Sequence, residues 1–441
     1  MNESEAIEPD QERTGLVALA VASVIVGAAT GAIGVAFRFS LECAEAWRGA
    51  LVAWGHAGHE AAFVLVALAA AAATGLAAWV VARFAPAASG SGIPHVEAVL
   101  RGKLPLAPLV LIPIKFAGGV LAIGAGLALG REGPTVQMGV SIAHAIGTSF
   151  RRNALDCRVL LAAGAGAGLA TAFNAPIAGA VFVLEELTRR FDTRTAVAAL
   201  GASASAIAMA RLLHGDLPDF HVPAQPFPGF AMSGAHLVLG AVLGVLGAAY
   251  CRAVVWTLDA AESFSRPDSV AHVTTRAALI GAAVGLLAWF APDLAGGGDA
   301  LTERALLGAS SVAGMLALFA ARFVLGAVSY AAGTPGGLFA PMLVLGAQTG
   351  LVFGRVCLDW FPGMSPATGD TSTFAVVGMA AFFVAVVRAP VTGIVLVTEM
   401  TASFTLLLPM LTACFTAMIV PLLLHVPPIY DSLGERAAHG R

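Results

Sequence analysis

Long apolar runs recur through almost the whole chain, and they restrict the class of fold that it can adopt. About a dozen runs alternate with short polar segments, at 15–40, 61–84, 104–130, 134–150, 158–187, 195–213, 233–257, 274–292, 305–330, 337–358, 373–398 and 403–425. Only 12% of the 441 residues are charged, against about 25% in soluble proteins. The chain is therefore predicted to be an all-α, polytopic membrane protein. Several runs are too short or too rich in glycine to cross about 30 Å as straight helices, which predicts partial and tilted ones.

The charged residues indicate how the protein lies in the membrane. The segment before the first run is acidic and that run is long, so it is unlike a secretory signal peptide, and we expect the first span to be retained. Arginines gather at 151–152, 158 and 189–194, which predicts cytoplasmic loops. We expect a multi-pass protein of the cell (inner) membrane with both termini in the cytoplasm. Lys115, inside an apolar run, either snorkels to the membrane surface or faces a pore.

Metal and disulfide sites are not indicated. The five cysteines stand singly in or beside apolar runs, without metal-like spacing. His56, His59 and Glu60 are not in the HExxH arrangement and lie in a polar segment, where solvated side chains are the simpler interpretation. We expect neither a metal nor a cofactor.

One polar segment between two apolar runs carries charge, Gly130-Arg131-Glu132-Gly133-Pro134. An unpaired carboxylate at the bilayer centre costs about 2.5–3.5 kcal/mol on insertion scales, so an intramembrane Glu is a functional candidate. The two glycines free the backbone, and Pro134 suits the first turn of a helix. We predict a helix break in which the helix beginning near Gly133 points unpaired N–H groups and its positive dipole end at an anion. Glu132 would lie in the mouth of that site.

The same segment permits an ordinary interpretation. Glu132 could be a loop carboxylate outside the membrane, paired with Arg131 and capping a helix, because Gly and Pro are common at helix ends. Taken alone, the segment does not decide between the two interpretations.

A second interruption, Gly90-Ser91-Gly92-Ile93-Pro94, follows the second apolar run. In the simpler interpretation, the segment is an ordinary turn between two helices. As a site, a hydroxyl between two glycines can approach a ligand closely and offers an O–H donor without a full charge.

Residues 164–187 are rich in Gly and Ala and end in Glu185-Glu186. The pattern resembles a dinucleotide fingerprint, but no strand precedes it, so we interpret it as close packing of membrane helices and expect no nucleic-acid or nucleotide partner. The paired carboxylates follow an apolar helix. They could serve in a site or cap the helix end beside Arg189 and Arg190.

The two halves of the chain repeat a pattern. The segment 175–179 is followed six residues later by Glu185, and 389–393 is followed by Glu399 at the same spacing. Corresponding Gly/Pro interruptions in two halves are typical of a transporter with repeated architecture and a midplane site. The second copy has no carboxylate at the position of Glu132, which favours a gating role for it. Three further positions match at one constant offset: Gly130, Pro134 and Gly139 with Gly337, Pro341 and Gly346.

The repeat gives the expected organisation. An acidic tail at 1–14 precedes a first membrane repeat at 15–215, a linker at 216–232 rich in Pro and His, and a second membrane repeat at 233–426. A C-terminal segment at 427–441 carries Tyr430, which could also be an interfacial anchor.

Together, GSGIP at 90–94, GREGPTVQMG at 130–139, AFNAPIAG at 172–179, GGLFAP at 336–341 and RAPVTGIVLVTEMT at 388–401, with the late Tyr430, resemble the CLC chloride channel and transporter family. The resemblance covers about 85–430. It implies two inverted-topology helical repeats whose broken helices meet at a midplane chloride site, and two such subunits in a homodimer within membrane lipid.

The resemblance also implies roles for individual residues. Ser91 and Tyr430 would donate hydroxyl hydrogen bonds to chloride, and the amides of Leu338 and Phe339 would complete the shell. Glu132 resembles the outer gating glutamate and Glu186 the inner proton glutamate of the exchanger branch. The residues that would support the site are Gly90, Gly92, Pro94, Lys115, Gly130, Arg131, Gly133, Pro134, Gly337 and Pro341.

The expected function is therefore exchange of chloride for protons, without enzymatic activity. Neutral donors bind chloride without a cationic trap, so the ion can leave again. His95 departs from the family pattern, in which a carboxylate is common. Ser91 favours chloride over the nitrate branch, and Tyr430 speaks against the fluoride branch.

Two other functions were weighed. A passive chloride channel of the same family is the nearer alternative, and Glu186 argues against it. An intramembrane hydrolase is remote, because Ser203 in Gly201-Ala202-Ser203 has no apparent His or Asp partner.

Overall fold

The computed structural model consists of packed helices and confirms the predicted all-α class. It describes residues 9–58, 61–215, 227, 229–263, 269–298, 301–303, 312–360 and 371–439. In that part of the chain, β pairing is limited to two isolated bridges. The helices of the first half are α1 (Pro9–His56), α2 (Ala62–Phe84), α3 (Ile93–Leu100), α4 (Leu111–Gly124), α5 (Glu132–Ser149), α6 (Ala154–Phe173), α7 (Pro176–Phe182), the π-helical turn η2 (Val183–Leu187) and α8 (Thr193–His214).

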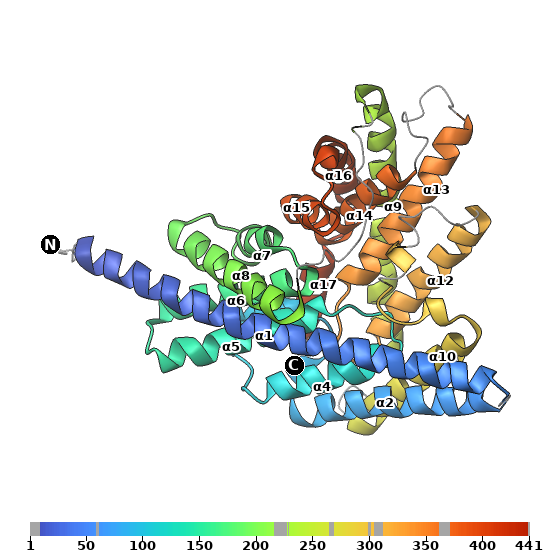
Figure 1. Ribbon diagram of the computed structural model, residues 1–441, viewed down its shortest axis with the longest axis horizontal. Helices are drawn as coiled ribbons and strands as arrows, with labels where there is room; N and C mark the ends of the chain where they lie inside the picture. The colour runs from blue at the N-terminus through green and yellow to red at the C-terminus, as the bar shows by residue number, and fades with distance from the viewer. Residues whose placement is uncertain are drawn as a thin grey trace.

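The second half also consists of both long and short helices. Figure 1 shows α1 running along almost the whole length of the molecule, with the C-terminal helices gathered on one side of it. The helices of the second half are α9 (Ser233–Ser263), α10 (Val270–Phe290), α12 (Val312–Tyr330), α13 (Phe339–Trp360), α14 (Ser372–Val387), α15 (Pro390–Thr401), α16 (Leu407–Leu423) and α17 (Ile429–His439).

Long and short apolar helices occur together, as the interrupted runs predict. Among the described residues, nine helices are long and apolar enough to cross a membrane, and α4, α14 and α15 are shorter apolar helices. Residues 1–8 of the predicted tail and most of the predicted linker at 216–232 lie outside the described residues. The helix α1 begins at Pro9, inside the range predicted for the tail.

Polar caps set the start of two helices of the first half. Asn153 accepts a hydrogen bond from the backbone N–H of Asp156 at the start of α6, and Asp192 accepts one from Thr195 at the start of α8. Each cap satisfies a backbone donor that has no partner within its own helix. At the other end of α6, Asn174 adopts φ 50°, a left-handed conformation that ends the helix.

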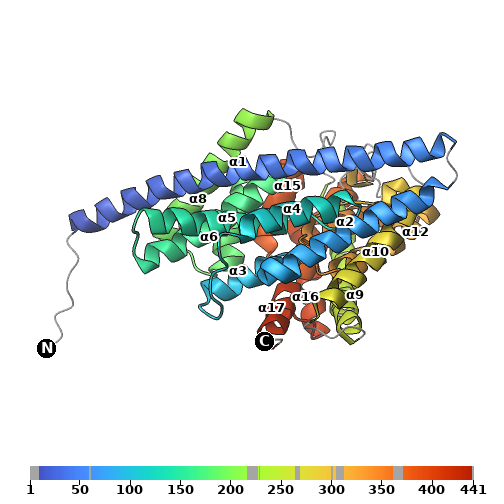
Figure 2. The ribbon, with the colours of Figure 1, turned by 90° about the horizontal axis from the view of Figure 1, so that it is seen from below.

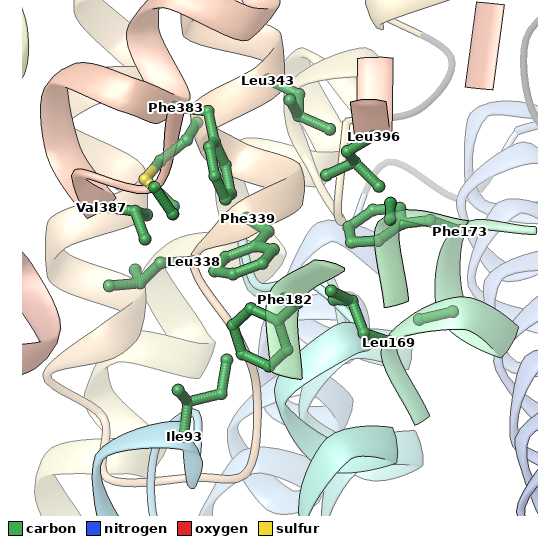
Figure 3. Close-up of a cluster of buried hydrophobic side chains, with 14 of the residues drawn as sticks. Ile93, Leu169, Phe173, Phe182, Leu338, Phe339, Leu343, Phe383, Val387 and Leu396 are labelled. Atoms are coloured by element: carbon green, nitrogen blue, oxygen red, sulfur yellow. The ribbon is translucent and has the colours of Figure 1, made fainter. Parts of the chain in front are cut away.

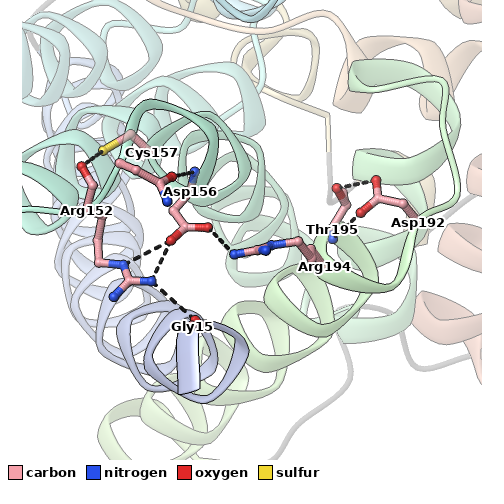
Figure 4. A network of polar contacts seen from close by, with 8 residues as sticks. Gly15, Arg152, Asp156, Cys157, Asp192, Arg194 and Thr195 are labelled. Atoms are coloured by element: carbon pink, nitrogen blue, oxygen red, sulfur yellow. Dashed lines mark hydrogen bonds and ion pairs between the residues drawn. The ribbon is translucent and has the colours of Figure 1, made fainter. Parts of the chain in front are cut away.

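A buried carboxylate joins three of these helices. Asp156 is fully buried and pairs with Arg152 at 2.5 Å and with Arg194 at 2.7 Å. Figure 4 shows Arg152 also donating to the carbonyl of Gly15 near the start of α1. Two of the arginines predicted to mark cytoplasmic loops, Arg152 and Arg194, are therefore gathered with the beginnings of α1, α6 and α8.

Glycines bring helices into backbone contact at corresponding places in the two halves. A Cβ atom on Gly139 of α5 would clash with the carbonyl oxygen of Gly164 on α6. The same relation holds between Gly346 of α13 and Gly378 of α14. These contacts confirm that the Gly/Ala-rich stretch packs helices closely.

Two glutamates tie the halves together reciprocally. The Glu185 carboxylate, in η2, accepts backbone hydrogen bonds from Val391 at 3.0 Å and Thr392 at 2.7 Å at the start of α15. The Glu399 carboxylate, in α15, accepts them from Ile177 at 3.1 Å and from the next residue at 2.8 Å, at the start of α7. Carboxylates are favourable at helix N-termini because they satisfy free N–H groups and complement the dipole. Glu185 thus caps a helix of the other half, a role that the sequence spacing does not predict.

Candidate anion and proton site

Three glycine-containing segments that are far apart in the sequence meet at the centre of the molecule. Gly130 and Gly337 exchange two backbone hydrogen bonds of 2.8 Å each. Gly90 donates to Thr334 at 3.0 Å and accepts from Gly336 at 3.1 Å. The predicted interruptions therefore lie side by side, and the starts of α3, α5 and α13 adjoin them.

Glu132 connects the two halves directly. It is the first residue of α5, it is fully buried, and its Oε1 accepts a hydrogen bond of 2.7 Å from the backbone N–H of Phe339, the first residue of α13. The alternative of a solvated loop carboxylate is wrong. The predicted geometry also needs a correction, because the carboxylate occupies the N-terminus of α13 rather than that of its own helix.

The glycines beside Glu132 provide space rather than unusual backbone angles. Neither Gly130 nor Gly133 has positive φ. A Cβ atom on Gly130 or on Gly337 would collide with the Glu132 carboxylate, and one on Gly133 would collide with the backbone of Ser91. The third residues of α5 and α13 are prolines, Pro134 and Pro341, as expected for a first helical turn.

The predicted chloride-binding residues surround the same point. Leu338 is fully buried and precedes the amide that holds Glu132. Tyr430, the second residue of α17, is fully buried and its ring centroid lies 5.8 Å from that of Phe339. The hydroxyls of Ser91 and Tyr430 are both buried and have no hydrogen-bond partner within the described residues. A buried hydroxyl without a partner costs about 1–3 kcal/mol, so a bound acceptor would stabilise this arrangement.

Aromatic rings enclose the Phe339 amide. Figure 3 shows the Phe339 ring between Phe182 and Phe383, with Leu338 and Ile93 close by. The ring centroid of Phe339 lies 6.2 Å from that of Phe182 and 4.7 Å from that of Phe383, both edge-on. Such an apolar shell excludes water, which strengthens the electrostatic interactions inside it.

Lys115 has a supporting position that neither sequence interpretation describes. Its side chain is fully buried in α4, and Nζ donates to the carbonyls of Ala88 at 2.9 Å and Gly90 at 2.7 Å. The ammonium group therefore holds the segment that precedes Ser91. The glycines of that segment, Gly90 and Gly92, have φ of 62° and 84°, which favours glycine at both positions.

Tyr330 was missed by the sequence analysis. Its hydroxyl accepts a hydrogen bond of 3.4 Å from the backbone N–H of Ser91, and its side chain is buried. A signal was present, because Tyr330 is one of only three tyrosines in the chain. His95, the departure from the family pattern, lies 3.4 Å from the amide nitrogen of Gln137.

Glu186 shares a cluster of charges with a second carboxylate, which was also missed. Glu97 of α3 is as deeply buried as Glu186, and the two carboxylates belong to one cluster of charges that Arg101, Arg189 and Asp431 complete. Arg101 contacts Glu97 at 3.2 Å, and Arg189 contacts Glu186 at 3.7 Å. Glu97 could have been found as the single acidic residue in a short apolar helix that begins at the GSGIP segment.

A cavity of about 160 Å³ adjoins the segment that leads into Glu132. Gly130 and Arg131 form part of its wall, together with Arg38, Glu42 and Glu45 of α1. Arg131 is held by a hydrogen bond of 2.8 Å from Nε to the carbonyl of Ala172. Two arginines and two glutamates thus line the cavity, and Arg38 pairs with Glu42 at 3.0 Å.

Comparison with known proteins identifies similar chains. Residues 73–421 match the family model described as voltage gated chloride channel. The chain is 41% identical over 361 residues to the H(+)/Cl(-) exchange transporter ClcA of Vibrio cholerae, covering 81% of this chain and 76% of that protein. It is 38% identical over 437 residues to ClcA of Salmonella paratyphi A, covering 97% and 90%. The crystal structure of a slow cyanobacterial Cl-/H+ antiporter superimposes with a TM-score of 0.90 at 34% identity, covering 96% and 98%.

Proposed function

The chain belongs to the voltage-gated chloride channel (CLC) family, and from this premise we propose that it exchanges chloride for protons across a membrane. The similar proteins from Vibrio and Salmonella are named as exchange transporters, and the cyanobacterial structure is that of an antiporter. The protein is thus a transporter that moves its substrates without converting them.

The contact between Glu132 and the Phe339 amide is the single observation that carries the mechanism. A carboxylate that occupies a helix N-terminus takes the place of an anion there, because the free N–H groups and the dipole favour either one. When Glu132 binds a proton, it loses its charge and most of its preference for the amide. Chloride can then take the vacated position. The ionised carboxylate and chloride therefore exclude each other at one place, and binding of a proton to Glu132 admits the anion.

Glu186 distinguishes exchange from passive conduction. A carboxyl group on the inner side can receive a proton from the cytoplasm and pass it toward Glu132, which a chloride channel does not need. Ser91 and Tyr430 would hold the anion on the inner side of the gate with neutral donors. A site without a fixed positive charge lets chloride leave again.

We further propose that the protein is a homodimer of the cell (inner) membrane, with both termini in the cytoplasm. The arginine-rich network around Asp156 supports a cytoplasmic position for the start of α1. Exposed apolar side chains are numerous on the helices that the reciprocal glutamates join and on their neighbours α8 and α16, and they suit a second copy or lipid: Ile177, Leu200, Val391, Leu411 and Phe415.

Flux measurements in proteoliposomes test the proposal. The purified protein is reconstituted with a chloride gradient and no pH gradient, and the external pH and chloride are recorded together. An exchanger moves protons uphill while chloride runs down its gradient. Chloride flux without any proton movement would instead identify the passive channel, and absence of both fluxes would reject the proposed function.

A further inference from the structure

Five charged groups from three segments form one cluster, which includes the two buried glutamates Glu97 and Glu186. Arg101 Nη2 lies 3.2 Å from Glu97 and 3.8 Å from Asp431 Oδ1. Arg189 Nη2 lies 3.7 Å from Glu186 and 3.4 Å from the same Asp431 oxygen. Asp431 therefore contacts both arginines, and each arginine is shared between Asp431 and one buried glutamate.

The two arginines are shared unequally. Arg101 is closer to Glu97 than to Asp431, whereas Arg189 is closer to Asp431 than to Glu186. The carboxylate of Asp431 thus draws the positive charge of Arg189 away from Glu186. Asp431 is also more exposed, at 28% of its side chain against 5% for Glu186, so Glu186 depends more on its charged neighbours than Asp431 does.

The helix that carries Asp431 is held at its other end by separate contacts. Arg436 of α17 pairs with Asp259 and, at 2.7 Å, with Glu262, both on α9. Figure 2 shows α17 beside the C-terminus, next to α16 and α9. Anchoring of the helix and placement of the Asp431 charge can therefore be tested independently.

We propose that Asp431 is a positioning residue of the inner proton site: it holds Arg189 off Glu186 and so keeps Glu186 able to bind the proton that is exchanged. This inference rests on the proposed exchange of chloride for protons. Asp431 directly follows Tyr430 in the chain. The same turn of α17 therefore places both the Tyr430 hydroxyl for the anion and the Asp431 charge that tunes the proton site.

Other charged and titratable groups near this cluster do not replace Asp431. Glu185 is turned toward the start of α15, and Arg388 donates to the carbonyl of Val426 at 3.1 Å. The charged and titratable groups of the cluster and of the elements around it are His95 and Glu97 on α3, Arg101 just after α3, Glu185, Glu186 and Arg189 in and after η2, Tyr430, Asp431, Glu435 and Arg436 on α17, Asp259 and Glu262 on α9, and Arg388 after α14.

The proposal is tested by the pH dependence of exchange in two variants that should move it in opposite directions. In Asp431→Asn a negative charge is lost and Arg189 is free to approach Glu186, so the ionised glutamate is stabilised. The pH at which coupled proton flux is half-maximal should fall. In Arg189→Gln the stabilising cation is lost, and that pH should rise. An opposite charge within about 4–6 Å changes a carboxyl pKa by about 1–3, and partial exposure reduces this to about half a pH unit or more.

Two controls separate charge from anchoring. Arg436→Gln removes the anchor at the far end of α17 and should leave the pH dependence unchanged, and Asp431→Glu should keep the wild-type profile more closely than Asp431→Asn. Shifts in the same direction for Asp431→Asn and Arg189→Gln, no shift in either, or an equal shift in Arg436→Gln would each overturn the inference. The proposed function fails separately, if the wild-type protein itself shows no coupled exchange.

Discussion

Oε1 of Glu132 accepts a hydrogen bond of 2.7 Å from the backbone N–H of Phe339, which lies 207 residues further along the chain. The contact places an acidic side chain of the first half on the N-terminus of a helix of the second half. Backbone pairing between Gly130 and Gly337 holds the two partners in register. The Glu132 carboxylate and the amide that binds it are therefore parts of one junction between the two halves.

The first prediction concerns this contact. In Glu132→Ala, chloride should continue to move while coupled proton movement is lost, because only a titratable carboxylate can both compete with the anion and carry a proton. Glu132→Gln should behave in the same way. The measurement is uphill proton movement driven by a chloride gradient, and its persistence in the Ala variant would show that Glu132 is not the gate.

The second prediction distinguishes the two neighbouring glutamates. Glu186→Ala should abolish proton coupling and spare chloride flux, since Glu186 is the buried member of the pair and a buried carboxylate can relay a proton. Glu185→Ala is the matched control: it removes the cap of α15, so it should lower the melting temperature in detergent and preserve coupling. Coupling that survives in the Glu186 variant and disappears in the Glu185 variant would reverse the assignment.

The third prediction concerns stability at the loop before α8. The backbone N–H of Thr195 donates to Asp192 and keeps the pKa of that carboxyl below its usual range. Because the folded pKa is depressed, the stabilising contribution is complete above the unfolded pKa of about 3.9 and is lost as the pH falls through the folded value. Asp192→Ala should lower the free energy of unfolding by about 1 kcal/mol at neutral pH. Thermal melting at pH 7 and below pH 4 checks it, and Asp192→Asn should retain most of the cap. An equal loss at both pH values would contradict the role assigned to the carboxylate.

The interruptions of the apolar runs could be predicted from the sequence because Gly and Pro determine the backbone conformation locally. The match of Gly130, Pro134 and Gly139 with Gly337, Pro341 and Gly346 anticipated which segments would meet. The division into domains remains a prediction, and the reciprocal caps of Glu185 and Glu399 support it.

What the sequence did not reveal depends on contacts between distant segments. The spacing of Glu185 shows that it ends a helix, but its partner at the start of α15 follows only from the packing of the two halves. Lys115 could be seen as an unusual charge, while its carbonyl acceptors 25 and 27 residues away could not. Tyr330 and Asp431 gain their positions from the meeting of α3, α12 and α17, for which no local pattern exists.

The last prediction concerns Ser91 and Tyr430. Their hydroxyls are buried and lack partners within the described residues, so each is expected to donate to one anion. A hydrogen bond to a charged group contributes about 1.5–3 kcal/mol, so Ser91→Ala or Tyr430→Phe should weaken chloride binding roughly 10- to 150-fold. Weaker binding should also loosen coupling to protons. Ser91→Pro should in addition shift preference toward nitrate, following the family pattern.

Calorimetric chloride titrations and anion-replacement fluxes measure these effects on folded protein. Thr416→Val is a suitable control, because its hydroxyl is exposed and donates to the carbonyl of Leu237 at 2.8 Å, away from the site. If Ser91 were only a turn residue and Tyr430 only an anchor at the membrane surface, substituting them would change the yield of folded protein without changing chloride affinity or anion selectivity. Since Tyr430 is fully buried against Phe339, an anchor at the membrane surface already disagrees with its position. Unchanged chloride affinity in both single variants would remove Ser91 and Tyr430 from the anion site.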